Sequence, residues 1–371
     1  MTTSLRRAAG SLLVVGLGGT ELTSLERAWL KLVRPAGIIL FRRNIADAQQ
    51  TRALLTEATG LGAPFGLRCV DLEGGSVDRL RDALAPMPSA QAVARAAFSS
   101  NRNQLAREHG VLVGQAVRAF GFNTTLAPVL DLGLPDSAEV MGTRVAAASP
   151  ASVVNYARAF LNGLASQGVA GCGKHYPGLG GGTRDSHLET PAIERTGREI
   201  WREDLEPYRA LRAELPMVMV NHAAYPATPG KAKPASVSSY WIRTILRKKI
   251  GYQGLVFSDD LEMGGILKFM SIEEAAVAAV RAGMDLMEIC HSPELILRAF
   301  EALLTEGERS QSFAALLFAR ATRTARLRTK LFAGGIPKPL TGKQFDGLRS
   351  QIIRFGETIA KAQPIAEVQS A

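Results

Sequence analysis

The sequence predicts an α/β fold: a (β/α)8 TIM-type barrel that forms a single domain with a short C-terminal helical extension. Eight short apolar runs occur along the chain, and most lack polar alternation, which is typical of parallel strands buried on both faces. Longer segments with apolar residues every three or four positions separate most of the runs and indicate amphipathic helices. This order favours a closed barrel. An open doubly wound sheet is the alternative, because periodicity does not reveal closure.

Each expected strand ends at a polar residue or a glycine cluster, which signals a turn. The eight strands are expected at Leu12–Leu17, Gly37–Leu40, Leu67–Val70, Thr124–Leu130, Val169–Gly173, Met217–Val220, Leu255–Phe257 and Leu286–Cys290. The helices between them are expected at Asp47–Thr59, Ala90–Phe120, Ser152–Gln167, Arg195–Leu215, Tyr240–Ile250, Ile272–Arg281 and Pro293–Thr305.

We expect residues 1–330 to form the barrel, and residues 331–371 to form a linker and a C-terminal helical tail. Gly and Pro are frequent in 331–343, as in a linker. Beyond it, apolar residues at helical spacing indicate one more amphipathic helix, marked by Phe345, Leu348, Ile352 and Ile359. The length of 371 residues then accommodates one barrel and a tail, since α/β barrels commonly form large single domains.

The chain carries 44 Lys and Arg against 34 Asp and Glu, a formal net charge of +10, which raises the question of a nucleic-acid partner. The densest basic tract is more simply the solvated face of the last barrel helix. Neither aromatic interleaving nor a nucleic-acid motif accompanies it, so we expect no such partner. The tract comprises Arg320, Arg323, Arg326, Arg328 and Lys330.

Cys69, Cys172 and Cys290 lie far apart in apolar surroundings, which indicates reduced core thiols of a cytosolic protein. No apolar run approaches the ~18 residues that span a bilayer, so we expect no membrane partner. Arg6 and Arg7 precede the first apolar run, as in a twin-arginine signal. That run is short and is needed as the first strand, so we expect a cytoplasmic protein, which we take to be a monomer.

In a barrel, the active site lies where the strands end and the βα loops begin. Charged residues follow several of the expected strands, and adjacent charges are costly there unless they are paired or used. They are Asp71, Glu73 and Arg79 after the third strand, Asp131 after the fourth, Lys174 and His175 after the fifth, His222 after the sixth, Asp259 and Asp260 after the seventh, and Glu288 and His291 at the eighth.

The segment 173–187, GKHYPGLGGGTRDSH, is the most informative in the chain. Its glycines permit a tightly turning loop. Asp185 and His187 are two residues apart, so the carboxylate can accept a hydrogen bond from the imidazole, orient it and raise its pKa. That pair suits general acid–base catalysis. The alternative is an anion-binding glycine loop with a surface histidine.

The segment 173–187 resembles the signature of glycoside hydrolase family 3, specifically of its bacterial β-N-acetylglucosaminidase branch, which carries K-H-F-P-G-x-G and then D-S-H. The segments 70–80 (VDLEGGSVDRL), 126–131 (LAPVLD) and 257–263 (FSDDLEM) resemble further motifs of the family. The matches run from about residue 10 to 330 in the family's order, and an ordered set of motifs is highly specific.

The resemblance implies a retaining glycosidase that needs no metal and no organic cofactor. Asp259 matches the nucleophile, which attacks the anomeric carbon and forms a glycosyl-enzyme intermediate; its alternative role is a helix N-cap, which suits Asp260 better. His187 matches the branch's unusual acid/base, and Asp185 matches its dyad partner. The usual glycosidase pair is two carboxylates, so this site departs from that rule.

The resemblance also implies that the terminal sugar is bound by charged residues, which suit vicinal hydroxyls because each hydroxyl both donates and accepts. The alternative to sugar binding for Lys174 is a structural ion pair with Asp131 or Asp71 inside the barrel mouth. The matching residues are Asp71, Arg79, Arg144, Lys174 and His175.

His222 matches a family histidine after the sixth strand, and it either lines the sugar subsite or braces the strand end. Three residues depart from the family pattern: Leu179 stands where many members have a histidine, Ser76 stands where they have an arginine, and Tyr176 replaces a phenylalanine. The first two changes remove polar groups close to the site and bear on the substrate preference.

The expected function is exo-β-N-acetylglucosaminidase activity on N-acetylglucosamine-containing muropeptides or disaccharides, in recycling of the cell wall. A phosphorylase of the same site is an alternative, because a histidine acid/base does not repel phosphate as a carboxylate does; a β-glucosidase of the same family is another. A Schiff-base aldolase using Lys174 represents a different reaction class. A dinucleotide site is excluded, because Glu21 stands where the third glycine is required.

Overall fold

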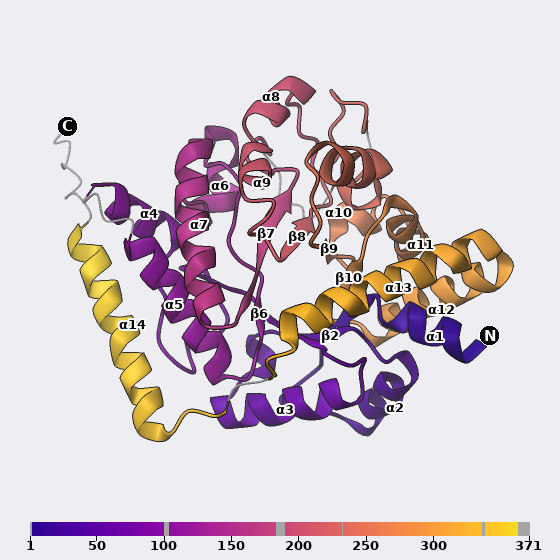
Figure 1. Cartoon of the computed structure of the whole chain (residues 1–371), viewed down its shortest axis with the longest axis horizontal. Coiled ribbons are helices and arrows are strands. Elements are labelled where there is room, and N and C mark those ends of the chain that lie inside the picture. Colours follow the sequence, from indigo (N-terminus) through magenta and orange to yellow (C-terminus); the bar gives the residue numbers. More distant parts are fainter. Residues whose placement is uncertain (1, 100–103, 183–189, 232, 336–337, 363–371) are drawn as a thin grey trace.

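The computed structural model describes residues 2–99, 104–182, 190–231, 233–335 and 338–362. Eight parallel strands close into a barrel that helices surround (Figure 1), which confirms the predicted fold class. The order around the barrel is β1 (Leu13–Val15), β10 (Leu286–Ile289), β9 (Leu255–Asp260), β8 (Met217–Val220), β7 (Ala170–Tyr176), β6 (Thr124–Thr125), β3 (Leu67–Val70) and β2 (Gly37–Leu40).

Helices follow most of the strands and cover the outside of the barrel (Figure 1). They are α1 (Thr2–Gly10), α2 (Ser24–Val33), α3 (Ala48–Gly60), α4 (Ala90–Ser99), α5 (Gln104–Ala119), α6 (Ala138–Met141), α7 (Pro150–Ser166), α8 (Gly197–Arg202), α9 (Glu206–Ala210), the π-helix η5 (Tyr240–Lys249), α10 (Gly264–Leu267), α11 (Ile272–Ala282), α12 (Pro293–Arg309), α13 (Gln311–Phe332) and α14 (Gly342–Ala362).

Several elements differ from their expected extent. The strand expected at Thr124–Leu130 has only Thr124–Thr125 in β6, since Pro128 has no amide hydrogen to donate to a ladder. The helix expected at Arg195–Leu215 is divided into α8 and α9, and α9 begins with Pro207 in its first turn. The sequence pattern also missed α1, α2 and a short antiparallel pair, β4 (Leu72–Gly74) and β5 (Val77–Asp78).

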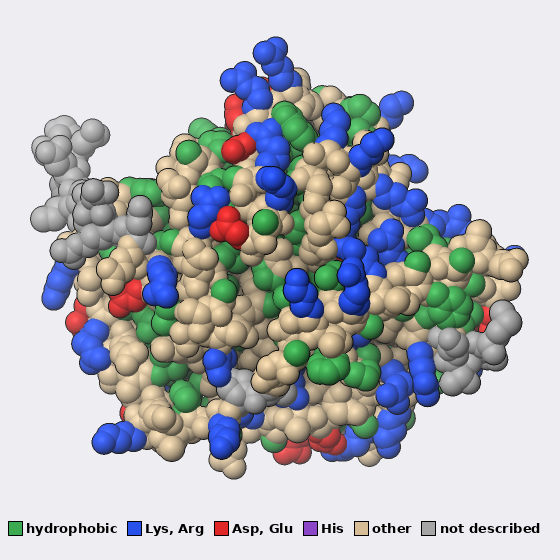
Figure 2. Space-filling view, viewed as in Figure 1, with side chains coloured by type: hydrophobic (Ala, Val, Ile, Leu, Met, Phe, Trp, Pro, Cys, Tyr) green, Lys and Arg blue, Asp and Glu red, His purple; other side chains and the backbone are tan. Residues whose placement is uncertain are grey.

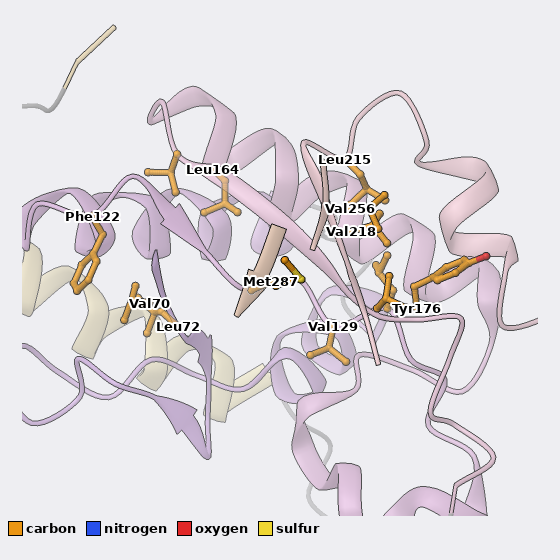
Figure 3. Packing of buried hydrophobic residues seen from close by; sticks show 14 of the residues in the cluster. Val70, Leu72, Phe122, Val129, Leu164, Tyr176, Leu215, Val218, Val256 and Met287 are labelled. Carbon is orange, nitrogen blue, oxygen red and sulfur yellow. The ribbon is translucent and has the colours of Figure 1, made fainter. Parts of the chain in front are cut away.

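The core has two parts, on either side of the strands. Side chains inside the barrel include Met217, Phe257 and the three cysteines; all the cysteines are free and buried, as predicted. Between the strands and the outer helices lies a larger cluster, part of which Figure 3 shows. It includes Val70, Val129, Tyr176, Val218 and Val256.

Arginines of α13 make buried contacts at the barrel. Arg328 is fully buried and donates to the backbone oxygens of Ala36 (3.2 Å) and Pro64 (3.0 Å). Arg320 and Arg323 pair with Asp285 at 3.5 and 3.4 Å. The expected solvated basic face is therefore wrong for these three residues, and the charge is spread over several elements of the surface (Figure 2).

The C-terminal helix α14 lies against α4 and α5 on the side of the barrel (Figure 1). Its Phe345 ring contacts Phe120 at a centroid distance of 5.8 Å, and Phe355 stacks on His109 at 6.0 Å. The expected amphipathic helix is thus confirmed, while the division of the chain at residue 330 stays a prediction. Within the described part of the chain, no helix is long and apolar enough to cross a membrane.

Candidate active site

A cavity of about 510 Å³ opens where the barrel strands end. Such a volume suits a small ligand. Six of the predicted site residues line it, and they come from four different βα segments. The six are Asp71, Arg79, Arg144, Lys174, His175 and Asp259. The other predicted catalytic residues, Asp185 and His187, lie outside the described residues.

A network of four charged side chains forms one wall of the cavity. Lys174, at the end of β7, donates to Asp71 Oδ1 at 3.0 Å, and its Nζ lies 2.7 Å from Glu73 Oε1. Arg144 donates two hydrogen bonds to Glu73, at 2.9 and 2.8 Å. Two carboxylates and two cations therefore alternate, and each ion faces a counter-ion.

The same network sets the charges of its members. Burial raises the pKa of Glu73, but Lys174 and Arg144 outweigh burial and hold it well below its usual range. Burial lowers the pKa of Lys174, but Asp71 and Glu73 outweigh it and raise that pKa above its usual range. Both cations are therefore charged and present fixed donors to the cavity.

Glu73 was not among the predicted sugar-binding residues, although it holds two of them. It lies in β4 and precedes Gly74, whose φ of +94° favours glycine. A Cβ at Gly74 would lie 2.0 Å from the Pro88 carbonyl oxygen. The Glu-Gly-Gly sequence after the third barrel strand was the signal that pointed to this residue.

His175 is held by Asp131, which is buried beneath it. Its Nδ1 donates to Asp131 Oδ2 at 2.6 Å, and its backbone amide donates to the same oxygen at 3.1 Å. The other oxygen, Oδ1, accepts from the Leu179 amide at 2.7 Å. Asp131 therefore orients His175 and does not pair with Lys174, which takes the other predicted partner, Asp71.

Asp259 faces the cavity from the end of β9. Burial raises the pKa of its carboxyl, but His175, His222 and Lys174 outweigh burial and lower it. One oxygen, Oδ1, accepts a hydrogen bond from the Asp260 amide at 3.0 Å. The result is an ionised and oriented carboxylate, which is the form that a nucleophile requires.

His222 does not line the cavity. It is fully buried, and both ring nitrogens have partners within the protein: Nδ1 lies 2.7 Å from Ser236 Oγ, and Nε2 lies 2.9 Å from the Asp260 carbonyl oxygen. Burial lowers its pKa despite the opposing effect of Asp259. This geometry favours the role of bracing a strand end over the role of contacting sugar.

Arg79 completes the polar lining of the cavity from beyond β5. Its Nη2 lies 3.7 Å from Asp71 Oδ2, and its guanidinium lies over the Phe41 ring at 5.7 Å from the centroid. Donors and acceptors therefore surround the cavity together, an arrangement suited to a ligand with several vicinal hydroxyls.

Two further groups on the cavity wall were not predicted to bind sugar or to take part in catalysis. Glu288 is buried, and its Oε1 has no hydrogen-bond partner among the described residues. Burial together with Asp260 and Asp71 raises its pKa well above the usual range. Close to it, Asp260, Cys290 and His291 bring potential metal-ligand atoms within 4.8 Å of one another.

Residues 4–327 match the family model described as glycosyl hydrolase family 3 N terminal domain. A β-hexosaminidase from Idiomarina loihiensis is 35% identical over 301 residues, covering 81% of this chain and 90% of that protein.

Two solved structures are similar to this chain over most of its length. One is a glycoside hydrolase family 3 β-N-acetylglucosaminidase from Paenibacillus, with a TM-score of 0.84, 30% identity, and coverage of 95% of this chain and 68% of that one. The other is NagZ from Neisseria gonorrhoeae in complex with N-trifluoroacetyl-D-glucosamine, with a TM-score of 0.75, 28% identity, and coverage of 96% and 98%. This chain therefore belongs to glycosyl hydrolase family 3, and it is a glycoside hydrolase of the β-N-acetylhexosaminidase group.

Proposed function

We propose that this enzyme is a retaining exo-β-N-acetylglucosaminidase that removes terminal, non-reducing N-acetylglucosamine from cell-wall fragments in the cytoplasm. The observation that carries the proposal is the ionised Asp259 carboxylate in a cavity lined by a fixed network of donors and acceptors. The similar Paenibacillus protein is a β-N-acetylglucosaminidase, and the similar Neisseria protein binds N-trifluoroacetyl-D-glucosamine; both support the choice of sugar.

The reaction takes two displacements. First, an Asp259 oxygen attacks the anomeric carbon, the bond from that carbon to the aglycone oxygen breaks, and protonated His187 gives its proton to the leaving oxygen. Neutral His187 then takes a proton from water, and the water oxygen attacks the anomeric carbon and releases Asp259. Asp185 orients His187 in both steps, and the product keeps the β configuration.

The network of Asp71, Glu73, Arg144 and Lys174 binds the terminal sugar in this proposal, together with His175 and Arg79. Lys174 and Arg144 donate to sugar hydroxyls, and Asp71 accepts from them. These side chains are already held by counter-ions in the protein, so they lose little conformational freedom when the sugar binds. The sugar ring is therefore held in one orientation.

The charge of Lys174 argues against the alternative of Schiff-base chemistry. An amine must be neutral to attack a carbonyl, and Asp71 and Glu73 raise the pKa of Lys174 even though burial lowers it. The ammonium therefore serves as a hydrogen-bond donor.

The test is to trap the glycosyl-enzyme. His187→Ala is mixed with an aryl β-N-acetylglucosaminide whose activated leaving group needs no acid, so that the intermediate forms but breaks down slowly. Mass spectrometry should find one N-acetylhexosaminyl group on the peptide that contains Asp259, and none in the double variant with Asp259→Ala. A label on another peptide, or rapid turnover by the double variant, would refute the proposed roles.

The substrate is tested by product analysis. Wild-type enzyme is given an N-acetylglucosaminyl anhydromuramic fragment, with and without phosphate. We expect free N-acetylglucosamine in both conditions, formed first as the β anomer in proton NMR. N-acetylglucosamine 1-phosphate in the phosphate arm would instead identify a phosphorylase, and an uncleaved fragment would contradict the cell-wall substrate.

A further inference from the structure

The proposed hydrolysis leaves one buried acid of the cavity wall, Glu288, without a role. This residue lies in β10 between Leu286 and Cys290, whose side chains belong to the core inside the barrel. Because side chains alternate along a strand, Glu288 points into the barrel as they do. It lines the cavity and is only 2% exposed. The carboxyl therefore lies at the inner end of the cavity.

The Glu288 carboxyl has hydrogen-bonding capacity that the protein does not use. Among the described residues, no group lies within hydrogen-bond distance of Oε1. The backbone of the same residue is held, since its amide donates to Ser258 Oγ at 3.1 Å. A buried polar group without a partner costs stability, and almost all such groups in folded proteins have one. An unpartnered group on a cavity wall therefore indicates a position where a ligand supplies the partner.

The surroundings of Glu288 keep the proton on its carboxyl. Burial raises its pKa most, and three neighbouring carboxyls raise it further against the opposing effect of one ammonium. The carboxyls are Asp260, Asp71 and Asp259, and the ammonium is that of Lys174. A carboxylic acid that keeps its proton has an O–H to donate, and a buried neutral acid can donate it to a ligand oxygen. Glu288 therefore offers a donor to the cavity.

The order of the strands places Glu288 across the cavity from the charged network. Lys174 ends β7, Arg144 follows β6 and Asp71 follows β3, and these three strands are neighbours in the barrel. In the ring of eight, β10 lies four strands from β6 and next to β9, which carries Asp259. A sugar whose hydroxyls face the network and whose anomeric carbon faces Asp259 therefore presents to Glu288 a group close to the anomeric carbon.

Two polar groups of the sugar lie next to the anomeric carbon: the ring oxygen and the substituent on carbon 2. The ring oxygen gains positive charge in the oxocarbenium-like transition state, so a donor to it would oppose the reaction. In an N-acetylhexosaminide, the other group is an acetamido group, with an accepting carbonyl oxygen and an apolar methyl. Met219 and Leu126 line the same cavity and belong to the core inside the barrel. One donor among apolar side chains matches the acetamido group.

We propose that Glu288 is a specificity-determining residue, whose carboxyl O–H donates a hydrogen bond to the carbonyl oxygen of the substrate's 2-acetamido group. This inference rests on the proposed function, which places the anomeric carbon at Asp259. Glu288 transfers no proton and leaves the acid–base steps to His187. The contact favours a 2-acetamido sugar over the corresponding glucoside, because the shorter hydroxyl on carbon 2 leaves the Glu288 donor without a partner.

The test compares two substitutions that differ in one property. Glu288→Gln keeps a donor in its amide N–H, whereas Glu288→Met keeps the length of the side chain and has no donor. Each variant and the wild type are assayed for kcat/KM on an aryl β-N-acetylglucosaminide and on the aryl β-glucoside with the same leaving group. The ratio of the two values reports on carbon 2, because both substrates share the nucleophile, the acid/base and the leaving group.

Glu288→Met should lower this ratio about tenfold, since the acetamido substrate alone loses a hydrogen bond. Glu288→Gln should keep the ratio within about threefold of the wild-type value. Glu273→Gln is the matched control, because Glu273 pairs with Arg298 on the exposed surface, and it should leave the ratio unchanged. Calorimetric binding of N-acetylglucosamine, which needs no turnover, should weaken about tenfold in Glu288→Met and stay close to wild type in Glu288→Gln.

A wild-type ratio in Glu288→Met would overturn the inference and leave the proposed function standing. A loss confined to substrates with poor leaving groups would also overturn it, because Glu288 would then act as an acid catalyst. If the wild type hydrolyses neither substrate, the proposed function fails, and the calorimetric comparison still decides whether Glu288 contacts the acetamido group. Glu288→Leu, which also lacks a donor, provides the same comparison if Glu288→Met folds poorly.

Discussion

Replacing Glu73 with glutamine removes the charge that holds two buried cations. The Glu73 side chain is 2% exposed, and it lies 2.7 Å from Lys174 and 2.8 Å from Arg144. Removing one partner of a buried ion pair costs about 3–5 kcal/mol of unfolding free energy. Stability of a folded domain is only about 5–15 kcal/mol in total, so Glu73→Gln should remove a large share of it at pH 7.

The pH dependence of this loss has a fixed sign. Burial raises the pKa of Glu73, but Lys174 and Arg144 outweigh it and hold the folded-state pKa below the ordinary value of 4.5. The carboxylate's contribution to stability is therefore complete above pH 4.5 and is lost as pH falls through the folded-state pKa. The difference between wild type and Glu73→Gln should be largest near pH 7 and smaller at pH 3.

The assay is urea unfolding followed by circular dichroism, for both proteins at both pH values. Glu273→Gln is the matched control, because Glu273 pairs with Arg298 on the exposed surface at 2.7 Å, where solvent screens the pair, and it should leave the midpoint nearly unchanged. A Glu73→Gln loss below about 1 kcal/mol at pH 7, or a loss that grows in acid, would refute the reasoning.

Three further predictions concern buried positions. Glu288→Gln should have a higher melting temperature than the wild type at pH 8, and the difference should be smaller at pH 4. Burial and Asp260 raise the pKa of Glu288 and keep it neutral in the folded protein, while the same group ionises in the unfolded chain; no gain over the wild type at pH 8 contradicts this. Burial lowers the pKa of His109 to about 3, so the free energy of unfolding of the wild type, measured with urea, should fall as pH falls from 6.5 towards 3. The free energy of unfolding of His109→Leu should fall less, and an equal fall in both proteins speaks against this. Gly16→Ala should cost about 1–3 kcal/mol or more, because its Cβ would lie 1.8 Å from the Cys290 oxygen; Gly19→Ala, with open space around it, is the control, and equal melting temperatures would count against the clash.

Local patterns predicted the barrel because each strand and helix follows from the hydrophobic pattern of the residues within it. The eight apolar runs correspond to the eight barrel strands, and α3, α7, α11 and α12 lie close to their expected ranges. Errors arose where one residue changes the backbone. Pro128 interrupts the ladder after β6, which resumes as an isolated bridge between Val129 and Lys174. Pro207 lies in the first turn of α9, within a segment whose pattern predicts one helix.

The site was harder to predict, because its pairing depends on contacts between distant segments. Strand-end positions indicated Asp71, Asp131 and Lys174, but which acid faces Lys174 depends on how the barrel closes. Closure places Glu73 between Lys174 and Arg144, and it places Asp131 under His175 instead. Arg328 shows the same limit, since its carbonyl partners come from residues 36 and 64.

Azide rescue of Asp259→Ala tests the central claim most directly, since azide can enter the space that the carboxylate leaves. The variant is given an activated aryl β-N-acetylglucosaminide. The account predicts that turnover falls at least about a thousandfold, and that azide restores it by attacking from the face that Asp259 occupies and yields the α-glycosyl azide. Turnover near that of the wild type without azide, or a β-glycosyl azide as the product, would contradict Asp259 as the nucleophile.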